Sequence, residues 1–231
     1  MNNHSASVGK GPAPILNSLS IVQHNCLGSW DLFLSSFELF KGAATYPSLV
    51  FLQEPPVNKA HLPSFNGFTS FYPPVRKPRV AAYLHISFLS SFWVVPRFNG
   101  ADDVLTLDVS FLEPLFGTNF HSFRIINAYS TNTLAHRGYL VSPETPFENQ
   151  DIPLLVVGDL NIHNPLSDPL RSFSAREIVS STPYFEKAAE AGFALLNPAG
   201  EYTRFPLVGK ARPSVIDLSF ANPLLLPLFK G

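Results

Sequence analysis

Charged residues are scarce in this sequence of 231 residues, and no single charge sign dominates. Lysine and arginine together number 16 and aspartate and glutamate 17, so charged residues make up 14% of the chain and the formal net charge is −1. Soluble domains usually contain about 25% charged residues. The composition excludes a polybasic nucleic-acid tail and an acidic solvating protein, although it leaves room for a local basic groove.

Cysteine and long apolar runs are also lacking. The single cysteine, Cys26, excludes an internal disulfide framework and a zinc site built from cysteines, and it favours an intracellular protein, with the nucleus as one option. The late apolar run over residues 220–229 is broken by one asparagine and two prolines, so no membrane span is expected. Residues 1–14 have no apolar core of signal-peptide length and are expected to form a disordered leader.

Proline and phenylalanine are abundant instead, with 22 and 21 residues, and hydrophobic residues make up 45% of the chain. That apolar share supports a folded core, and the prolines are expected to stiffen loops. The length suits one α/β domain with a large core and falls short of two, so we expect a single domain over residues 15–231.

Short apolar runs between turn residues predict a strand-rich domain. Apolar residues at i, i+4 and i+7 predict an amphipathic helix over residues 30–44. Thr182-Pro183 predicts the N-cap and first residue of a helix over residues 184–191. Strands with helices between some of them predict an α/β sandwich. The expected strands are residues 19–23, 49–53, 81–84, 92–95, 104–109, 123–128, 154–157 and 215–220.

Acidic, amide and phenol side chains stand at the ends of these expected strands, where ligand sites of sheet-based folds gather. Singly, most have an ordinary explanation, because asparagine and Gly-Asp are common in turns and a glutamate can be a solvated strand end. Asp217 lies inside an apolar run, where an unpaired carboxylate is costly to bury, so a hydrogen-bonding role is expected for it. The strand-end residues are Asn25, Gln53, Glu54, Asn127, Tyr129, Asp159, Asn161 and Asp217.

In chain order these residues form the segments Q-x-N (23–25), L-Q-E-P (52–55), N-A-Y (127–129), G-D-L-N-I-H (158–163) and S-V-I-D-L (214–218). Together the segments resemble the endonuclease/exonuclease/phosphatase superfamily, whose DNase-I-like fold is shared with abasic-site endonucleases. The resemblance spans about residues 19–222, and G-D-x-N-x-H and S-x-I-D-L are its specific elements. The Q-E-P form, the N-A-Y-S segment and the S-x-I-D-L form look most like endonuclease domains of LINE-type (non-LTR) retrotransposons, which precede a reverse transcriptase.

This resemblance implies a four-layer α/β sandwich, in which two packed β-sheets are flanked by helices. It also implies a divalent-metal-dependent phosphodiester hydrolase that nicks DNA, with Mg²⁺ or Mn²⁺ as the cofactor. Glu54 and Asn25 are the implied metal ligands, in keeping with the preference of hard cations for carboxylate and amide oxygens. The implied partners are DNA and a reverse transcriptase domain downstream, with no membrane.

The resemblance also implies four catalytic roles. Asp159 would orient or deprotonate the attacking water, and Asn161 would hydrogen-bond the scissile phosphate. Tyr129 would face the same phosphate with its phenol and ring. Asp217 resembles the acid that orients a catalytic histidine, as acids do in other His-acid pairs.

That histidine is missing from this sequence. In the family it lies in an S-D-H segment shortly after the I-D-L strand, whereas none of the seven histidines here follows Asp217. His163 belongs to the G-D-x-N-x-H element and does not simply take that role. We therefore expect a C-terminally truncated domain that lacks its last strand and exposes a sheet edge. Three functions stay open: a DNA-nicking enzyme, a non-catalytic remnant of that domain, and a phosphatase of the same superfamily.

Two basic clusters are expected to flank the site and to neutralise phosphates. The alternative is that each is simply a solvated loop, and the near-zero net charge predicts weak, salt-sensitive binding. The clusters are Arg76, Lys77 and Arg79 in a proline-rich loop, and Arg204, Lys210 and Arg212 before the last expected strand.

Overall fold

A computed structural model describes ten parts of the chain. They are residues 20–41, 48–58, 61–86, 92–98, 102–111, 114, 118–130, 147, 151–203 and 215–229, with the backbone alone described for residues 38–41. The expected leader over residues 1–14 and the basic cluster of Arg204, Lys210 and Arg212 lie outside the described residues.

The smaller sheet has four strands in the order β1-β2-β4-β3. Strands β1 and β2 run parallel, and the other two pairings are antiparallel. Strand β2 is buried along its whole length, whereas β1 is half-buried throughout because it forms an edge of the sheet as described. The strands are β1 (Ile21–Asn25), β2 (Leu49–Gln53), β3 (Phe68–Phe71) and β4 (Val80–His85).

The larger sheet has six strands in the order β5-β6-β7-β8-β10-β9. Strands β7 and β8 are parallel, and their neighbours pair antiparallel. Buried and half-buried residues alternate along β6, as expected for a strand with one face in the core. The strands are β5 (Phe92–Arg97), β6 (Val104–Phe111), β7 (Ser122–Tyr129), β8 (Leu154–Asp159), β9 (Ala194–Leu195) and β10 (Asp217–Ala221).

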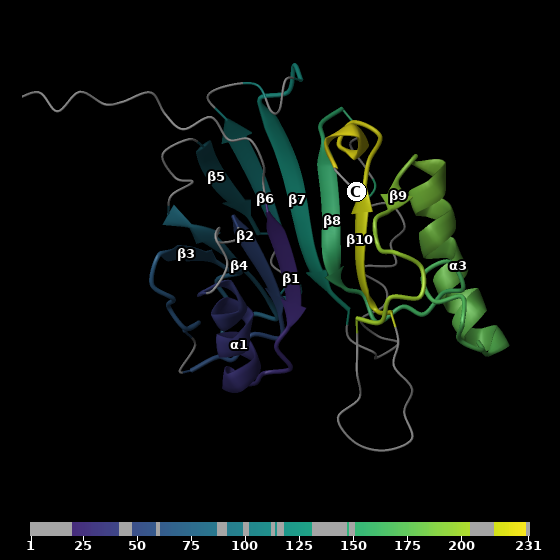
Figure 1. The fold of residues 1–231 in the computed structure, drawn as a ribbon, viewed down its shortest axis with the longest axis horizontal. Helices are drawn as coiled ribbons and strands as arrows, with labels where there is room; N and C mark the ends of the chain where they lie inside the picture. The colour runs from purple at the N-terminus through teal and green to yellow at the C-terminus, as the bar shows by residue number, and fades with distance from the viewer. Residues whose placement is uncertain are drawn as a thin grey trace, which may run out of the picture.

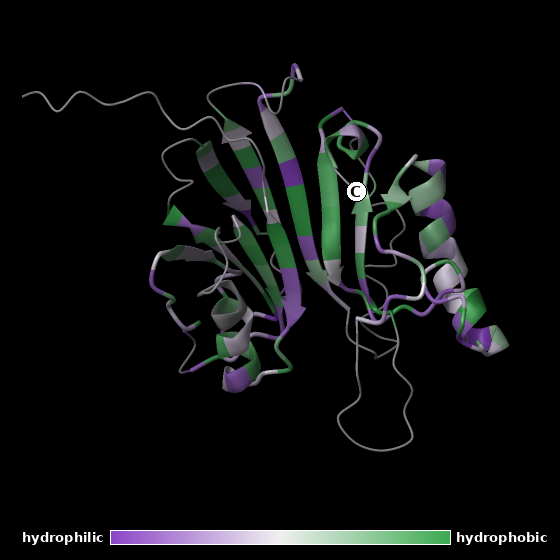
Figure 2. Ribbon diagram, viewed as in Figure 1, coloured by the Kyte–Doolittle hydropathy of each residue, from purple (hydrophilic) through white to green (hydrophobic). Residues whose placement is uncertain are grey.

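Hydrophobic packing joins these sheets into a sandwich between two helices (Figure 1). The main core lies between the sheets, where Phe51 and Leu84 of the smaller sheet share a cluster with Leu107 and Ile125 of the larger. Helix α1 (Trp30–Lys41) packs on the outer face of the smaller sheet, and α3 (Ala175–Glu190) on that of the larger. Figure 2 shows the apolar colouring concentrated in the strands between these helices. The architecture confirms the expected α/β sandwich.

Helix α3 corrects one expectation from the sequence. It begins at Ala175 instead of residue 184, because Ser174 is its N-cap and forms a reciprocal capping box with Glu177. Pro183 lies inside the helix, and the Thr182 hydroxyl donates to the carbonyl of Ile178 instead of capping a helix start. A short 3₁₀ helix, η3 (Leu226–Leu228), follows β10.

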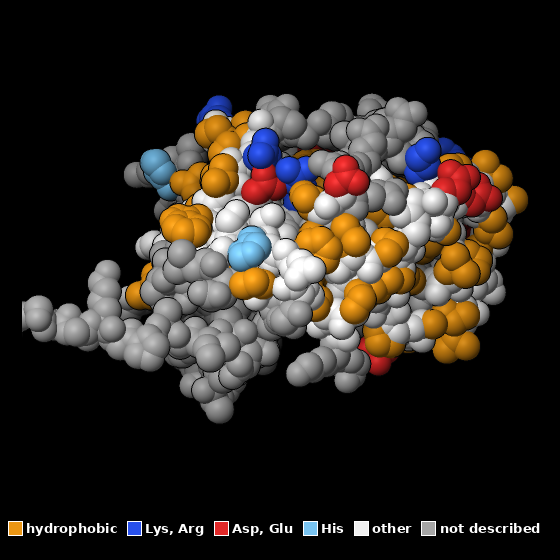
Figure 3. Space-filling model, turned by 90° about the horizontal axis from the view of Figure 1, so that it is seen from above, with side chains coloured by type: hydrophobic (Ala, Val, Ile, Leu, Met, Phe, Trp, Pro, Cys, Tyr) orange, Lys and Arg blue, Asp and Glu red, His pale blue; other side chains and the backbone are white. Residues whose placement is uncertain are grey.

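The surface seen from above shows no separation of charge. In Figure 3, apolar side chains cover more of this face than charged ones do, and basic and acidic groups lie next to one another. Among the described residues, no helix has the length and apolar character needed to cross a membrane.

Candidate active site

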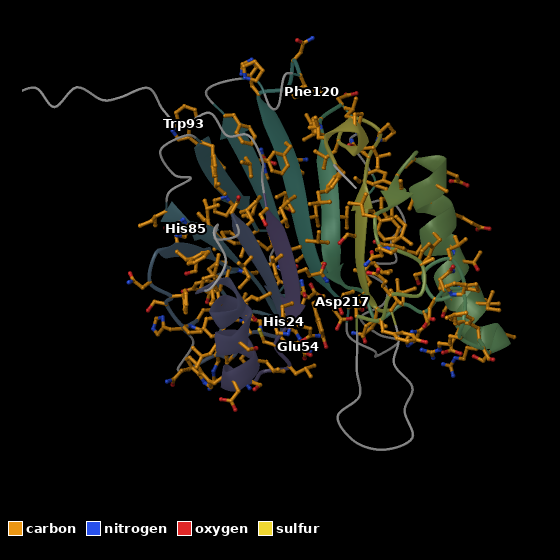
Figure 4. The ribbon with its side chains drawn as sticks, viewed as in Figure 1. His24, Glu54, His85, Trp93, Phe120 and Asp217 are labelled. Carbon is orange, nitrogen blue, oxygen red and sulfur yellow. The ribbon has the colours of Figure 1, made fainter. Side chains whose placement is uncertain are left out.

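The strand register brings the expected site residues to one end of the sandwich. Strands β1 and β2 are parallel neighbours and end together, with Asn25 opposite Gln53. Strands β7 and β8 likewise end together, with Tyr129 opposite Asp159. Strand β10 runs the other way and begins here, so that Asp217 stands opposite Asp159. Figure 4 shows Glu54 and Asp217 at this end of the two sheets.

Asp159 lies at the centre of the site and is only 2% exposed. The side-chain amide of Asn25 donates to its Oδ2 over 2.5 Å, and the backbone N–H of Asn161 donates to its Oδ1 over 3.0 Å. Burial, followed by the negative charge of Asp217, raises the pKa of Asp159 to about 7, although the two hydrogen bonds act in the opposite direction. Asp159 is therefore poised to exchange a proton near neutral pH.

The close approach of strand β7 explains why a glycine, Gly158, precedes this aspartate. A Cβ atom added at Gly158 would lie 1.9 Å from the carbonyl oxygen of Ala128 on the neighbouring strand β7. No side chain fits that gap, so the close approach of β7 and β8 requires glycine. The glycine of the G-D pair is therefore required by packing.

Buried amides connect the two sheets behind the site. Gln53 and Asn127 are fully buried and joined by a hydrogen bond of 2.6 Å from Gln53 Nε2 to Asn127 Oδ1. The amide nitrogen of Asn127 also donates to the backbone carbonyl of Ala81, 3.0 Å away. At the rim, Gln23 Nε2 donates to Asp217 Oδ1 over 3.2 Å. The amides of the Q-x-N, Q-E-P and N-A-Y segments therefore fix the relative position of the sheets, a role that the sequence did not reveal.

Glu54 is held by a cation and a phenol. Arg79 Nη2 lies 2.7 Å from Glu54 Oε1, and the Arg79 guanidinium stacks over the Tyr129 ring, 4.2 Å from its centroid. Burial, then the charge of Glu54 and a hydrogen bond to it, raises the pKa of the Tyr129 phenol well above its usual range. The phenol is therefore protonated at neutral pH and can donate to an anion.

Arg79 differs from the two other residues of its predicted basic cluster. Arg76 and Lys77 are exposed, whereas Arg79 is half-buried and directed at the acidic site. The feature of the sequence that could have revealed this contact is the position of Arg79 directly before strand β4. Because Val80 pairs with Gln53 in an antiparallel ladder, the residue before Val80 must face the residue after Gln53.

Unusual backbone conformations occur at the same end of the molecule. Among the described non-glycine residues, Leu27, Glu54 and Asn161 have positive φ angles, of 49°, 43° and 49°. Two of these are expected site residues, and the third follows Asn25 by two positions. Such conformations cost about 1–3 kcal/mol each and persist where surrounding contacts hold them, most often at functional sites. At Asn161 one such contact is the side-chain amide, which donates to the carbonyl of Ser130 over 2.7 Å.

The donor set suits a hard divalent cation bound with water. The negative charges of Glu54 and Asp217 both raise the pKa of Asp159, so three carboxylates lie close enough to interact. In the part of the chain that the structure describes, no group of three acidic, histidine or cysteine residues forms a ready cage. Magnesium is commonly held by one or two carboxylates and several waters, which this arrangement can supply through Glu54 and the amide oxygen of Asn25.

The remaining expected residues have defined surroundings. Thr203 Oγ1 accepts a hydrogen bond from the backbone N–H of Asp217 over 3.0 Å, which fixes the start of β10. His163 accepts a hydrogen bond of 2.8 Å from Arg171, which also pairs with Glu177 of the α3 cap. His163 is therefore linked to the helix cap beside the site. His24 contacts Ser36 of helix α1, on the opposite side of β1 from Asn25.

Comparison with known proteins finds similarity in structure alone. No family model matches the sequence, and neither does any curated protein. The endonuclease domain of TRAS1, a telomere-specific non-LTR retrotransposon, matches with a TM-score of 0.68 and 16% identity over 93% of this chain and 90% of that one. The APE2 catalytic domain of Xenopus laevis matches with a TM-score of 0.61 and 12% identity, over 90% and 84% of the two chains. The chain therefore has the DNase-I-like fold, an α/β sandwich shared with these two catalytic domains.

Proposed function

We propose that this chain is a divalent-metal-dependent phosphodiester hydrolase that nicks DNA. The observation that carries the proposal is the convergence around Asp159. This buried carboxylate bonds to Asn25, faces Asp217 across the β8–β10 ladder, and stands beside Tyr129. Phosphodiester hydrolysis needs an activated water and donors for the charge that develops on the phosphoryl oxygens, and these side chains are of the types that supply both.

We assign a role to each side chain on the basis of its chemistry and its surroundings. Asp159, with its pKa near 7, takes the proton of the attacking water. The phenol of Tyr129 donates to a phosphate oxygen, and the amide of Asn161 donates to the same phosphate. Glu54 and Asn25 would hold Mg²⁺ or Mn²⁺, which supplies Lewis-acid stabilisation of the phosphoryl charge.

The biological setting that we propose is the endonuclease step of retrotransposon insertion, with a reverse transcriptase domain downstream in a longer polyprotein. Its support is the set of sequence segments described above together with the fold of the TRAS1 domain. Nuclear DNA would be the substrate in that setting.

We expect slow turnover from the 231 residues as they stand. Asp217, whose family counterpart orients a histidine, here accepts a hydrogen bond from Gln23. General acid–base groups typically contribute about 10²–10⁴-fold to a rate, so a site working without that imidazole would nick close to the detection limit. This contact is also the observation that favours the second candidate, a non-catalytic remnant of the domain.

A plasmid-nicking assay tests the proposal. Supercoiled DNA is incubated with the protein and Mg²⁺ or Mn²⁺, and relaxed circles are quantified for the wild type, Asp159→Ala and Asp151→Ala. Asp151 is an exposed acid before the opposite end of β8, so it controls for the loss of one negative charge. We expect slow, metal-dependent nicking that Asp159→Ala removes and Asp151→Ala retains.

The other outcomes separate the alternatives. Nicking that survives Asp159→Ala at full rate would place the chemistry elsewhere. Metal binding without nicking, even at high protein concentration, would favour the remnant. Release of phosphate from a soluble phosphomonoester, without DNA nicking, would favour the phosphatase.

A further inference from the structure

The ion pair between Arg79 and Glu54 puts a positive charge on the carboxylate that the proposed function assigns to a metal ion. Arg79 Nη2 lies 2.7 Å from Glu54 Oε1, and the two side chains are 31% and 27% exposed. A divalent ion entering at Glu54 would meet both an occupied oxygen and a like charge. Metal binding therefore has to compete with the guanidinium.

The backbone keeps Arg79 in this position even when its side chain moves. The N–H of Glu54 donates to the carbonyl of Arg79 over 2.7 Å, and the N–H of Arg79 donates to the carbonyl of Asp102 over 2.6 Å. Asp102 precedes Asp103, whose carbonyl accepts from the N–H of Tyr129 over 2.8 Å. These backbone hydrogen bonds thus fix the main chain of Arg79 and of the two residues beside its guanidinium, Glu54 and Tyr129. A change of partner by Arg79 requires side-chain rotation alone.

A phosphate is the natural second partner for this guanidinium. Its central carbon, Cζ, lies over the ring of Tyr129, the residue that the proposed function places against the scissile phosphate. Within the described residues, Glu54 is the side-chain acceptor bonded to Arg79, through one nitrogen, Nη2. Arginine has five N–H donors and binds phosphate in a bidentate manner, so further donors remain for such a ligand.

We infer that Arg79 serves two anions in turn: it pairs with Glu54 in the free protein and moves to a phosphate oxygen of the substrate, which frees Glu54 for the metal ion. Phosphate and metal therefore bind cooperatively. This inference rests on the proposed function, because it uses the same phosphate and metal positions. It adds a positioning residue, Arg79, and an order of events in which substrate promotes metal binding.

Thermodynamic linkage sets the expected size of the effect. Each ligand must raise the affinity for the other by the same factor. Coupling between sites typically amounts to about 5–150-fold, and the partial exposure of this ion pair places it near the low end. We expect about a fivefold increase in Mn²⁺ affinity when phosphate saturates the protein.

Mn²⁺ binding to the full 231-residue chain tests this without any turnover. Free Mn²⁺ is measured by electron paramagnetic resonance, with and without inorganic phosphate, and a protein-free blank corrects for Mn²⁺–phosphate complexes. The proteins are the wild type, Arg79→Met and Arg176→Met. Arg176 is an exposed arginine in the first turn of α3, outside both basic clusters, and is the matched control for the lost charge.

We expect phosphate to raise the Mn²⁺ affinity of the wild type and of Arg176→Met about fivefold. Arg79→Met should bind Mn²⁺ more tightly than the wild type without phosphate, and phosphate should change its affinity little. The wild-type titrations need no variant, so they decide the question even if Arg79→Met does not fold.

Two results would overturn the inference, and they are distinguishable. If the wild type binds Mn²⁺ with the same affinity at all phosphate concentrations, Arg79 is only a structural partner of Glu54, and Asp159-dependent nicking would still support the proposed function. If no saturable Mn²⁺ site exists in the wild type or in Arg79→Met, the metal requirement of the proposed function fails and the inference fails with it.

Discussion

Two aspartates lie beside opposite ends of strand β7, and their surroundings shift their pKa values in opposite directions. Near its start, Arg124 faces Asp108 of β6 and bonds to it over 2.6 Å, and Arg97 adds a second ion pair. Burial opposes ionisation of Asp108, but the two arginines outweigh it and lower the pKa of this carboxyl. At its end, Tyr129 pairs with Asp159, whose side chain bonds to the amide of Asn25, and the pKa there is raised.

This contrast separates a structural acid, Asp108, from the acid that we propose to be reactive, Asp159. A carboxylate with two arginines is charged at any ordinary pH and contributes to stability. A buried carboxylate with amide donors and other carboxylates nearby keeps a proton until about neutral pH, which disfavours its charged form and suits proton transfer. The arrangement around Asp159 therefore costs stability where the arrangement around Asp108 provides it.

The largest effect on stability should come from filling the gap that places Asp159. Gly158→Ala would put a Cβ atom 1.9 Å from the Ala128 carbonyl oxygen, so β7 and β8 would have to separate. We expect a loss of about 4 kcal/mol or more in unfolding free energy, because backbone cannot move aside as a flexible side chain can. Urea denaturation measures this, with Gly200→Ala as the comparison. A loss below about 1 kcal/mol would show that the close approach is not required.

The comparison glycine, Gly200, has no backbone atom close to the position of an added Cβ among the described residues. Gly200 has a positive φ of 79°, and among the described residues a Cβ atom there would meet just the Leu170 side chain, at 3.9 Å. Its substitution reports conformational strain of about 1 kcal/mol without a backbone clash. The difference between the two variants isolates the cost of the β7–β8 contact.

A smaller effect on the unfolding free energy, a gain instead of a loss, is expected when the charge of Asp159 is removed. Its folded pKa of about 7 exceeds the unfolded value of 3.8, so between these pH values the folded chain holds a proton that the unfolded chain has lost. Wild-type stability should therefore fall as pH rises from about 4 to about 7, by about 2–4 kcal/mol, and stay level above that. Asp159→Asn should lack this decline.

The measurement compares denaturation midpoints of the wild type and Asp159→Asn from pH 4.5 to pH 8 in the presence of EDTA. Asp159→Asn also changes the hydrogen bond with Asn25, but that contribution is constant over this pH range and leaves the difference in slope intact. Parallel pH profiles for the two proteins would show that Asp159 titrates normally in the folded state.

The sequence predicted the strands and the residue types of the site better than it predicted the caps and long-range contacts that hold them in place. Continuous apolar runs such as residues 49–52 became buried strands, because burial on both faces leaves a continuous signal. The half-polar strand Phe68–Phe71 and the two-residue strand β9 had no such signal and were not predicted. The start of α3 was misplaced because Thr182-Pro183 imitates a helix start, while the true capping box lies eight residues earlier at Ser174.

For the candidate site, too, the residues were predicted and some of their contacts were not. Its side chains could be named because they stand at strand ends in segments that resemble one superfamily, and the structure brings Asn25, Asp159 and Asp217 together. The contact of Arg79 with Glu54 was not predicted, because it depends on the β2–β4 register, which places the residue before β4 opposite the residue after β2. Contacts between strands that lie far apart in the sequence are properties of the fold that no single segment encodes.

The smallest of these effects concerns the structural acid. Asp108→Asn removes the charge that Arg97 and Arg124 share, and it should lower the unfolding free energy at pH 7 by about 1–2 kcal/mol, since the pair is only partly buried. The folded pKa of Asp108 is lowered, so its contribution is present above the unfolded value of 3.8 and is lost as pH falls through the folded value. The stability difference between wild type and Asp108→Asn should thus be constant from pH 5 to pH 8, where that of Asp159→Asn changes most. Asp151→Asn, at an exposed position, controls for the loss of one negative charge. If Asp108→Asn and Asp159→Asn gave the same pH profile, the difference between the two ends of β7 would lie in packing and not in charge.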